Sequence, residues 1–459
     1  MKKLFRKAFS GKGLPVSRKT LIVLSAFGAV LSGNVVHATF LKYFTDYIGM
    51  SPGAFGVIYM IFMVWNAVND PLFGGIIDNA KPHPKKGKYV YIMKVTAPVI
   101  LISMVLMLLA GPDWPSFLTY IYLIVGLFIF DTAYTSFIIS FNSYVLAVAP
   151  STDERADFSL IQNYIFMIPS FISTSIAVTF LTGGYPRYVI ILLYTGFAVI
   201  GGVLFMVSKI ALKDSPDLYS NYEPDNVGMK QLLKSFVPIM KNRNFLMFAL
   251  YNIFAVGAAS TYMNSYLYYM QYVAGASGFV AAIPDLLGGV YQLMVYPVAA
   301  YIIRKRGVRS MLRTLLWVSV MAFIGLFLAQ SYYQALIGYV LLMTGFAAVY
   351  AANTPMLGVI IDEDKSRTKV YKPGVYLGIA AIFAIPARAL HVAIFSFVIE
   401  YFGYDGMAAV QTERAITGIR IGAGLIPGIM VLLGIIPLFF FTIDKKKEKQ
   451  LVQSEPDII

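Results

Sequence analysis

The sequence contains no cysteine, only three histidines and few charged residues. Of its 459 residues, 13% are charged and 58% are hydrophobic. The absence of cysteine excludes disulfide bonds and thiolate metal sites. The mean hydropathy of +0.70 is far from that of soluble domains and indicates a membrane protein. No set of nucleophiles, acids and bases converges in the pattern, so we predict neither an enzyme nor a resident metal.

Apolar stretches of roughly 20 residues or more recur along the chain, each long enough to cross a hydrocarbon core of about 30 Å as a helix. A polar segment at 211–243 interrupts them. We therefore predict an all-α polytopic membrane protein with an N-terminal six-helix bundle at 1–210, a C-terminal six-helix bundle at 244–442 and a tail at 443–459. The twelve predicted spans are 20–45, 52–77, 90–110, 117–148, 159–182, 188–210, 244–273, 279–303, 310–329, 334–361, 374–401 and 416–442.

The net charge of +14 comes from Lys and Arg that gather before the first span and after spans two, eight, ten and twelve, as in KPHPKKGK, RKRGVR, KSRTKVYK and KKKEK. Because basic residues concentrate in cytoplasmic loops, we expect both termini and the central loop to be cytoplasmic in a multi-pass protein of the plasma membrane. The first apolar stretch is too long for a signal peptide and is expected to be retained. This pattern argues against a nucleic-acid partner.

Asp70 is an ionisable residue inside the second span, in the stretch AVNDPLFGGIIDNAK. It precedes Asp78, at the expected cytoplasmic end, by eight residues, which places it about 12 Å inside the membrane. Asn66 lies one turn before it on the same helical stripe. Because charges inside membranes are costly, we interpret Asp70 and Asn66 as the coupling site for a cation, either H⁺ or Na⁺. A charge pair that packs helices together is the alternative.

Asp131 falls near the middle of the fourth span, and Tyr134 and Thr135 follow one turn later. Carboxylates accept hydrogen bonds from sugar hydroxyls and aromatic rings cover the apolar face of a sugar, so the three residues predict a polyol site. The alternative is that Asp131 pairs with Arg388, a basic residue far from either end of the eleventh span. An ion pair from Arg388 to Asp70 or Asp131 would be made in one transport state and broken in another.

Two histidines and the seventh span add further candidates. His37 in the first span and His391, one turn after Arg388, could relay protons or simply be hydrogen-bonded. Asn264 and Tyr268 in the seventh span are candidates to line a substrate cavity, although interhelix packing explains most of that segment.

Several longer stretches of the sequence, taken in their order along the chain, indicate a family. The first half contains YFTDYIGMSP, NDPLFGGIIDNAK followed by KKGKYV, FDTAYTSF and PSTDERADFSLIQN, and the second half contains NSYLYYMQYVAG, KPGVYLGI and TGIRIGAGLIPGIMVLLGIIPL. Together they resemble the glycoside-pentoside-hexuronide:cation symporter family of the major facilitator superfamily, over nearly the whole chain. The resemblance implies twelve transmembrane helices in two six-helix bundles that work by alternating access.

The resemblance also implies roles for single residues. Asp70 matches the family carboxylate that binds the coupling cation, and Asp131 matches the fourth-helix aspartate that hydrogen-bonds the sugar. Asn66 stands where the melibiose permease, a member of the family, has a second cation-site aspartate. This change favours H⁺, or a Na⁺ site of lower affinity.

Other positions depart from the permease. Its sugar-stacking tryptophan falls near Thr135 and its fifth-helix arginine falls near Gln162 or Asn163, so galactoside specificity does not transfer. Gly74 and Asp78, together with Lys88, resemble the cytoplasmic gate motif of the superfamily.

We therefore predict a secondary active transporter that couples uptake of a sugar, glycoside or hexuronate to H⁺ or Na⁺. We expect a monomer in the lipid bilayer with no cofactor besides the coupling ion. A lysolipid symporter on the same scaffold is the main alternative, and a membrane-embedded enzyme or receptor is a second. The substrate and the choice of cation stay open at this point.

Overall fold

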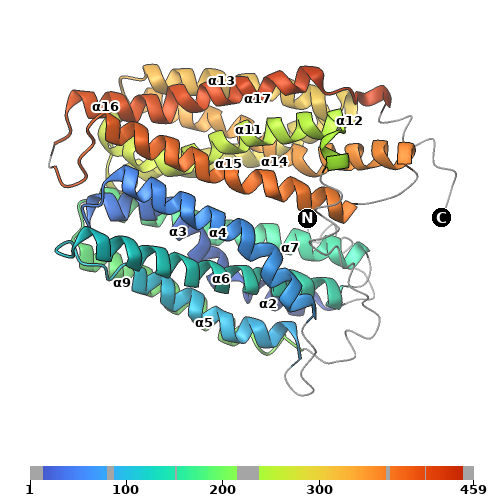
Figure 1. Cartoon of the computed structure of the whole chain (residues 1–459), viewed down its shortest axis with the longest axis horizontal. Coiled ribbons are helices and arrows are strands. Elements are labelled where there is room, and N and C mark those ends of the chain that lie inside the picture. Colours follow the sequence, from blue (N-terminus) through green and yellow to red (C-terminus); the bar gives the residue numbers. More distant parts are fainter. Residues whose placement is uncertain are drawn as a thin grey trace. The chain divides into compact units, whose positions relative to one another are not determined.

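The computed structural model describes residues 14–79, 87–149, 152–213, 237–368, 373–408 and 410–447, and most of these residues are helical (Figure 1). The first half contains α2 (Val16–Leu24), α3 (Phe27–Asp46), α4 (Pro52–Asn79), α5 (Tyr89–Met107), α6 (Ser116–Val148), α7 (Thr152–Phe171), the π-helical turn η1 (Ile172–Ile176), α8 (Ala177–Thr182) and α9 (Arg187–Ser208). The second half contains α11 (Arg243–Tyr268), the π-helical turn η3 (Tyr269–Val273), α12 (Gly278–Arg306), α13 (Val308–Leu328), α14 (Tyr332–Thr368), α15 (Pro373–Tyr401), α16 (Glu413–Arg420), the π-helical turn η4 (Ile421–Leu425) and α17 (Ile426–Phe440).

Helix occupies each of the twelve predicted spans within these described residues. The first span is formed by α2 and α3, the fifth by α7, η1 and α8, the seventh by α11 and η3, and the twelfth by α16, η4 and α17. Ten helical segments of the described chain are long and apolar enough to cross a membrane. The prediction of an all-α polytopic membrane protein is confirmed. Most of the predicted central loop, the basic N-terminal segment and the end of the tail lie outside the described residues.

Local sequence signals set several helix ends. The Asn242 side chain accepts hydrogen bonds from the backbone N–H groups of Asn244 at 2.9 Å and Phe245 at 3.3 Å. It therefore caps the N-terminus of α11, where backbone donors have no partner within the helix. Gly307 separates α12 from α13 at a φ of 84°, a backbone conformation that residues with a Cβ rarely adopt.

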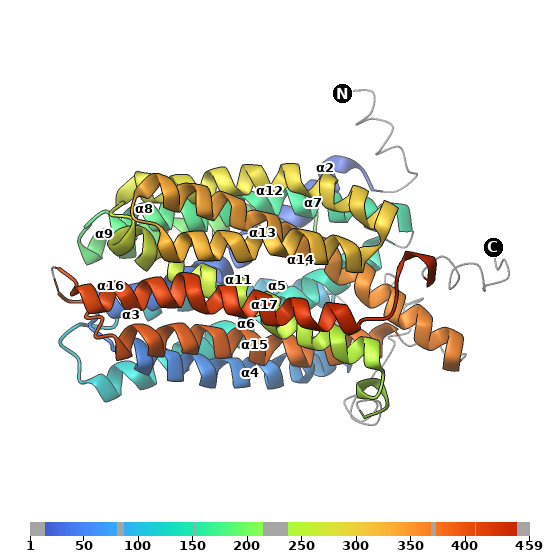
Figure 2. The same ribbon diagram turned by 90° about the horizontal axis from the view of Figure 1, so that it is seen from above.

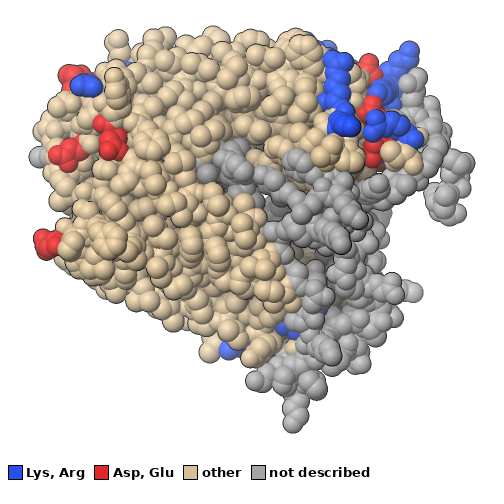
Figure 3. Space-filling view, viewed as in Figure 1, with Lys and Arg blue, Asp and Glu red and all other residues tan. Residues whose placement is uncertain are grey.

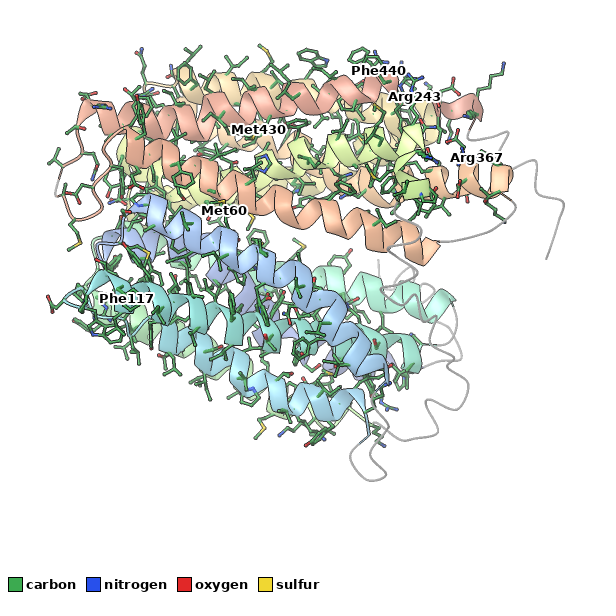
Figure 4. All side chains as sticks on the ribbon, in the orientation of Figure 1. Met60, Phe117, Arg243, Arg367, Met430 and Phe440 are labelled. Carbon is green, nitrogen blue, oxygen red and sulfur yellow. The ribbon has the colours of Figure 1, made fainter. Side chains whose placement is uncertain are left out.

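The chain divides into two compact units. The first comprises Met1–Tyr43 and Val64–Pro224, and the second comprises Phe44–Met63 and Asp225–Ile459. In the first unit α5 packs against α6 and α9, while α2 packs against α7 and α9. In the second unit α14 packs against α12 and α13, and α11 packs against α15 and α17, an arrangement that Figure 2 shows from above. Arg243 and Arg367 mark the start of α11 and the end of α14 (Figure 4).

In the first unit, an arginine and a tyrosine cap the end of α5. Arg187 donates to the carbonyl oxygens of Leu108 at 3.0 Å and Ala110 at 2.5 Å, and the Tyr43 hydroxyl donates to Leu108 at 2.6 Å. The last carbonyls of a helix have no partner within it, and they carry partial negative charge. The Arg187 guanidinium therefore donates hydrogen bonds to these carbonyl oxygens and also offsets their partial negative charge.

The second unit repeats this arrangement at the end of α13. Arg420 donates to the carbonyl oxygen of Ala329, and the Tyr269 hydroxyl donates to that of Leu326 at 2.6 Å. The tyrosine comes from the first or seventh span, the arginine from the sixth or twelfth, and the capped helix from the third or ninth. Each unit therefore uses equivalent spans for the same task, as an internal six-helix repeat requires.

Charged side chains gather at the ends of the helices, and the described surface between these ends is largely uncharged in the view of Figure 3. Large apolar side chains are also exposed within the helices, such as Met294 on α12 and Met321 on α13. A soluble protein rarely exposes so much apolar surface, whereas a bilayer solvates it.

Two glycines bring α3 and α9 into close contact in the first unit. A Cβ on Gly28 would lie 2.7 Å from the Cα of Gly201, and a Cβ on Gly201 would lie 2.7 Å from the Cα of Gly28. Small residues allow membrane helices to pack backbone against backbone and so gain dispersion contacts.

We expect Gly28→Ala to destabilise the protein by about 1–3 kcal/mol, because the added methyl group forces two helix backbones apart. The measurement is the unfolding midpoint of the purified protein in detergent. Gly196→Ala on α9 is the control, since nothing lies within 4 Å of a Cβ there. An equal midpoint for both variants would contradict the close approach of α3 and α9.

Candidate functional site

Three polar side chains of the first unit meet between α4 and α6. Asn66 donates through Nδ2 to Oδ1 of Asp131 at 2.9 Å, and Asn69 donates through Nδ2 to Oδ2 of the same carboxylate at 2.9 Å. Asp131 is 2% exposed. Because Asn66 and Asn69 are three residues apart on α4, one helix face presents both amides to both carboxylate oxygens.

A second link joins the same two helices one turn further along. The Thr135 hydroxyl on α6 donates to Oδ1 of Asp70 on α4 at 2.8 Å. Asp70 follows Asn66 by four residues, and Thr135 follows Asp131 by four residues. The two carboxylates therefore occupy successive turns of one interhelical ladder, which are about 6 Å apart along each helix.

The described hydrogen bonds to both carboxylates come from neutral donors. Asp131 bonds to two amides and Asp70 bonds to a hydroxyl, and neither has an ionic partner among the described residues. Hydrogen bonds reduce the cost of burying a carboxylate, but they do not neutralise its charge. Two like charges in adjacent turns of membrane-spanning helices favour the binding of a proton or a metal cation beside them.

Asn69 is a member of this ladder that the sequence analysis did not single out. Its side chain is fully buried, and its Oδ1 atom has no hydrogen-bond partner among the described residues. A buried acceptor without a partner is costly, so this oxygen is available to a cation or to a donor. The signal was present in the sequence, because Asn69 lies three residues after Asn66 on the same face.

The hydrogen bonds of the ladder join residues that the sequence analysis assigned to two different sites. Sequence analysis joined Asn66 with Asp70 as a coupling site and Asp131 with Thr135 as a sugar site. The structure instead pairs Asn66 with Asp131 and Thr135 with Asp70. The residues of the two predicted sites therefore lie in two neighbouring hydrogen-bonded groups between the same helices, α4 and α6.

The other candidates in the first unit lie on α3, α6 and α7. The Tyr134 ring stacks on Phe130 with centroids 5.8 Å apart, and it packs against Gly33 of α3. Gln162 on α7 and His37 on α3 are half-buried. The side chain of Asn163 lies outside the described residues.

The candidates in the second unit serve different contacts. The buried Asn264 amide donates to the carbonyl oxygen of Ser260 on its own helix at 3.0 Å. The buried His391 ring packs against Gly257 of α11. Arg388 belongs to α15, but its side chain is outside the described residues.

Tyr268 belongs to a hydroxyl cluster around Asp46. Its hydroxyl lies 2.8 Å from Oγ1 of Thr45, which donates to Oδ1 of Asp46 at 2.7 Å. The Tyr404 hydroxyl donates to the same Asp46 atom at 2.7 Å. Burial, together with the nearby Asp46 charge, raises the pKa of Tyr404. The hydroxyl therefore stays protonated and keeps donating to Asp46.

The predicted gate motif is described in part. Gly74 on α4 faces Ile139 of α6, whose Cδ1 would lie 3.8 Å from an added Cβ. The Lys88 ammonium lies 5.1 Å from the centroid of the Tyr89 ring. The side chain of Asp78 is outside the described residues, so the gate itself stays a prediction.

A comparison with protein families identifies the chain. The family model described as MFS/sugar transport protein matches residues 21–445. The chain belongs to this family. The resemblance to the glycoside-pentoside-hexuronide:cation symporters is thereby confirmed, and with it the major facilitator fold of a multi-pass membrane transporter rather than an enzyme.

Relatives of this MFS sugar transport protein extend over nearly its whole length. It is 23% identical to a glucuronide carrier protein homolog of Escherichia coli over 90% of this chain and 89% of that protein. It is 21% identical to an isoprimeverose transporter of Lactiplantibacillus pentosus over 96% of this chain and 92% of that protein. A solved nucleoside transporter with 13% identity shares the fold at a TM-score of 0.68, covering 93% of this chain and 100% of that chain.

We expect Asn69 and Asp131 to be energetically coupled by about 1.5–3 kcal/mol, the range for hydrogen bonds to charged groups. A double-mutant cycle of Asn69→Ala and Asp131→Ala, read as unfolding free energies in mixed micelles, measures this coupling. Asn69→Ala combined with Tyr122→Phe is the control. The Tyr122 hydroxyl bonds the carbonyl of Leu106, away from the ladder, so the two effects should add. Additivity in the first cycle would refute the contact.

Proposed function

We propose that this MFS sugar transport protein is a cation-coupled symporter of a sugar, glycoside or hexuronate, and that it works by alternating access. The observation that carries the proposal is the ladder of two carboxylates between α4 and α6, in which each carboxylate bonds to neutral donors. Relatives named as a glucuronide carrier homolog and an isoprimeverose transporter support this substrate class.

In the proposed cycle, Asp70 binds the coupling cation. It is half-buried on α4 and its carboxylate accepts a single described hydrogen bond, from Thr135. Binding of H⁺ or Na⁺ removes the uncompensated charge, and removal of that charge favours burial of the site when the transporter closes.

Asp131 is the proposed contact for the solute. Its two oxygens accept from Asn66 and Asn69, and each carboxylate oxygen has capacity for another donor. A solute hydroxyl could therefore donate to Asp131 without breaking the hydrogen bond from either side-chain amide. Asn66 bonds Asp131, the proposed solute contact, and lies one turn before Asp70 on α4. Cation and solute therefore stabilise the same arrangement of α4 and α6. This shared stabilisation is the coupling free energy of a symporter.

The proposal also covers location and cation. The plasma membrane, with both termini in the cytoplasm, follows from the distribution of Lys and Arg. Asn66 in place of a second carboxylate favours H⁺ as the coupling ion, and a Na⁺ site built with the free Asn69 oxygen is the second possibility.

The test is solute-driven proton movement in proteoliposomes, with glycosides, pentoses and hexuronates scanned with and without Na⁺. We expect one solute to cause proton uptake. In Asp70→Asn the solute-driven signal should fall by about 5- to 150-fold, the range that corresponds to a coupling of 1–3 kcal/mol. Exchange of labelled solute across the membrane should continue, because a neutral side chain mimics the cation-bound form.

Asp113→Asn is the matched control, since Asp113 is an exposed carboxylate between α5 and α6. It should behave as the wild type. A response that depends on Na⁺ and is lost in Asp70→Asn would assign the coupling to Na⁺. Silence for every sugar, accompanied by uptake of lysolipid, would overturn the substrate class.

Variants of Thr135 test cation coupling separately from solute binding. We expect Thr135→Val to reduce the number of cations moved per solute, because Asp70 loses its described donor, while Thr135→Ser should preserve coupling. The measurement is the ratio of proton flux to labelled-solute flux. A higher KM with an unchanged ratio would instead place Thr135 among the solute contacts.

A further inference from the structure

Two arginines lie in the first turns of α13, beside the end of α17 in the second unit. Arg309 and Arg313 are four residues apart, so their side chains share one face of the helix. Both are half-buried. Arg313 is the sixth residue of α13, about 8 Å along the helix from its start. A cation at such a position in a membrane-spanning helix is a functional candidate because its burial is costly. Nothing in the proposed cycle uses it.

Arg309 holds the end of α17. Its Nε atom donates to the carbonyl oxygen of Leu438 at 2.8 Å, and its Nη2 atom donates to that of Phe439 at 2.9 Å. These carbonyls belong to the last turn of α17, where backbone acceptors have no partner within the helix. The third nitrogen of Arg309, Nη1, makes no hydrogen bond with the described residues and can still donate.

Arg313 lacks a backbone contact of this kind. Its guanidinium carbon lies 4.1 Å from the centroid of the Phe439 ring, and the side chain makes no hydrogen bond or ion pair with the described residues. The ring attracts the charge but does not replace a hydrogen-bond acceptor. The other half-buried arginines of the described chain each bond a backbone carbonyl, and these are Arg18, Arg187, Arg309 and Arg420. Arg313 is therefore the exception among them.

The surface beside Arg313 is apolar and exposed. Trp317 lies one turn after Arg313 on α13 and is 48% exposed, and Phe439 is 50% exposed. Ile436 on α17 and Met321 on α13 are also exposed. Tryptophan is enriched where membrane helices meet the lipid headgroups, and a long arginine side chain near a helix end extends toward those headgroups. Arg313 therefore stands at an apolar surface that a bilayer covers.

The charges that act on this pair of arginines do not neutralise it. The two guanidinium groups repel each other, and the Asp444 carboxylate attracts Arg309. Asp444 is exposed, and its Oδ1 atom also accepts from the backbone N–H of Lys447 at 2.8 Å. Lys and Arg gather at this end of the second unit (Figure 3). An anion that contacts both guanidinium groups would offset their repulsion, and phosphate oxygens match the donors of arginine.

We propose that Arg313 and the Nη1 atom of Arg309 bind the phosphate of an anionic phospholipid on the exposed surface of α13 and α17. The Phe439 ring occupies one side of the Arg313 guanidinium, and the N–H donors of Arg313 are left for the phosphate oxygens. Trp317 lies where an acyl chain of the same lipid passes. The apolar surface favours a lipid over free phosphate, because only the lipid also covers Trp317 and Phe439. The inference does not depend on the proposed symport.

The test is lipid titration of the full-length protein in detergent, followed by native mass spectrometry, with phosphatidylglycerol as the anionic probe and phosphatidylcholine as the zwitterionic reference. We expect the wild type to bind the first phosphatidylglycerol more tightly than phosphatidylcholine. Arg313→Gln should weaken this binding by roughly tenfold, as the loss of a hydrogen bond to a charged group predicts. Arg313→Lys should also weaken it, because lysine keeps the charge but lacks the planar fork. Phe439→Leu should weaken it because the ring that positions Arg313 is lost.

Arg414→Gln is the matched control. Arg414 also lies over an aromatic ring, that of Tyr401 at 5.6 Å, but it is at the start of α16, about 40 Å from Phe439 along the same span. It should leave phosphatidylglycerol binding unchanged. Equal affinity of the wild type and Arg313→Gln would contradict the inference. Full affinity in Arg313→Lys would reduce it to attraction by charge alone, and displacement of the lipid by inorganic phosphate would exclude a lipid as the occupant. A wild type that prefers phosphatidylglycerol but shows no solute-driven cation movement would overturn the symport proposal alone.

Discussion

The candidate site depends on the cost of placing a carboxylate in a membrane-spanning helix. The chain reduces that cost in the first unit with amides and a hydroxyl, which donate hydrogen bonds to Asp131 and Asp70 without neutralising their charge. A permanent salt bridge would fix the site in one charge state. Neutral donors leave the charge available to a mobile cation, which is what the proposed symport requires.

Other helices of the two units are held by contacts of another kind. Arg187 with Tyr43, and Arg420 with Tyr269, hold the carbonyl ends of α5 and α13 in their respective units. In the first unit, Gly28 and Gly201 add a backbone contact between α3 and α9. In both units, arginine side chains therefore bond the carbonyl end of a helix. The carboxylates of the α4 and α6 ladder instead accept hydrogen bonds from neutral donors. The helix ends are thus held by charged donors and the candidate site by neutral ones.

Most of the fold could be predicted from the sequence, because a bilayer imposes one simple requirement on each span. Roughly 20 apolar residues must form a helix, and the twelve predicted stretches all contain one. The sequence did not reveal the π-helical turns η1, η3 and η4, since apolar periodicity does not distinguish them from α-helix. The sequence also did not indicate that residues 44–63 associate with the second unit, because packing across the chain leaves no local pattern.

For the site, the sequence by itself determined which residues are chemically unusual. Asp70, Asn66 and Asp131 stand out because a charge or an amide in an apolar run is costly wherever the helix packs. Only the tertiary structure decided their partners. It joined Asn66 to Asp131 and Thr135 to Asp70, and it brought in Asn69. Helical spacing fixes the face on which a residue lies, but the neighbouring helix and its register decide what that face meets.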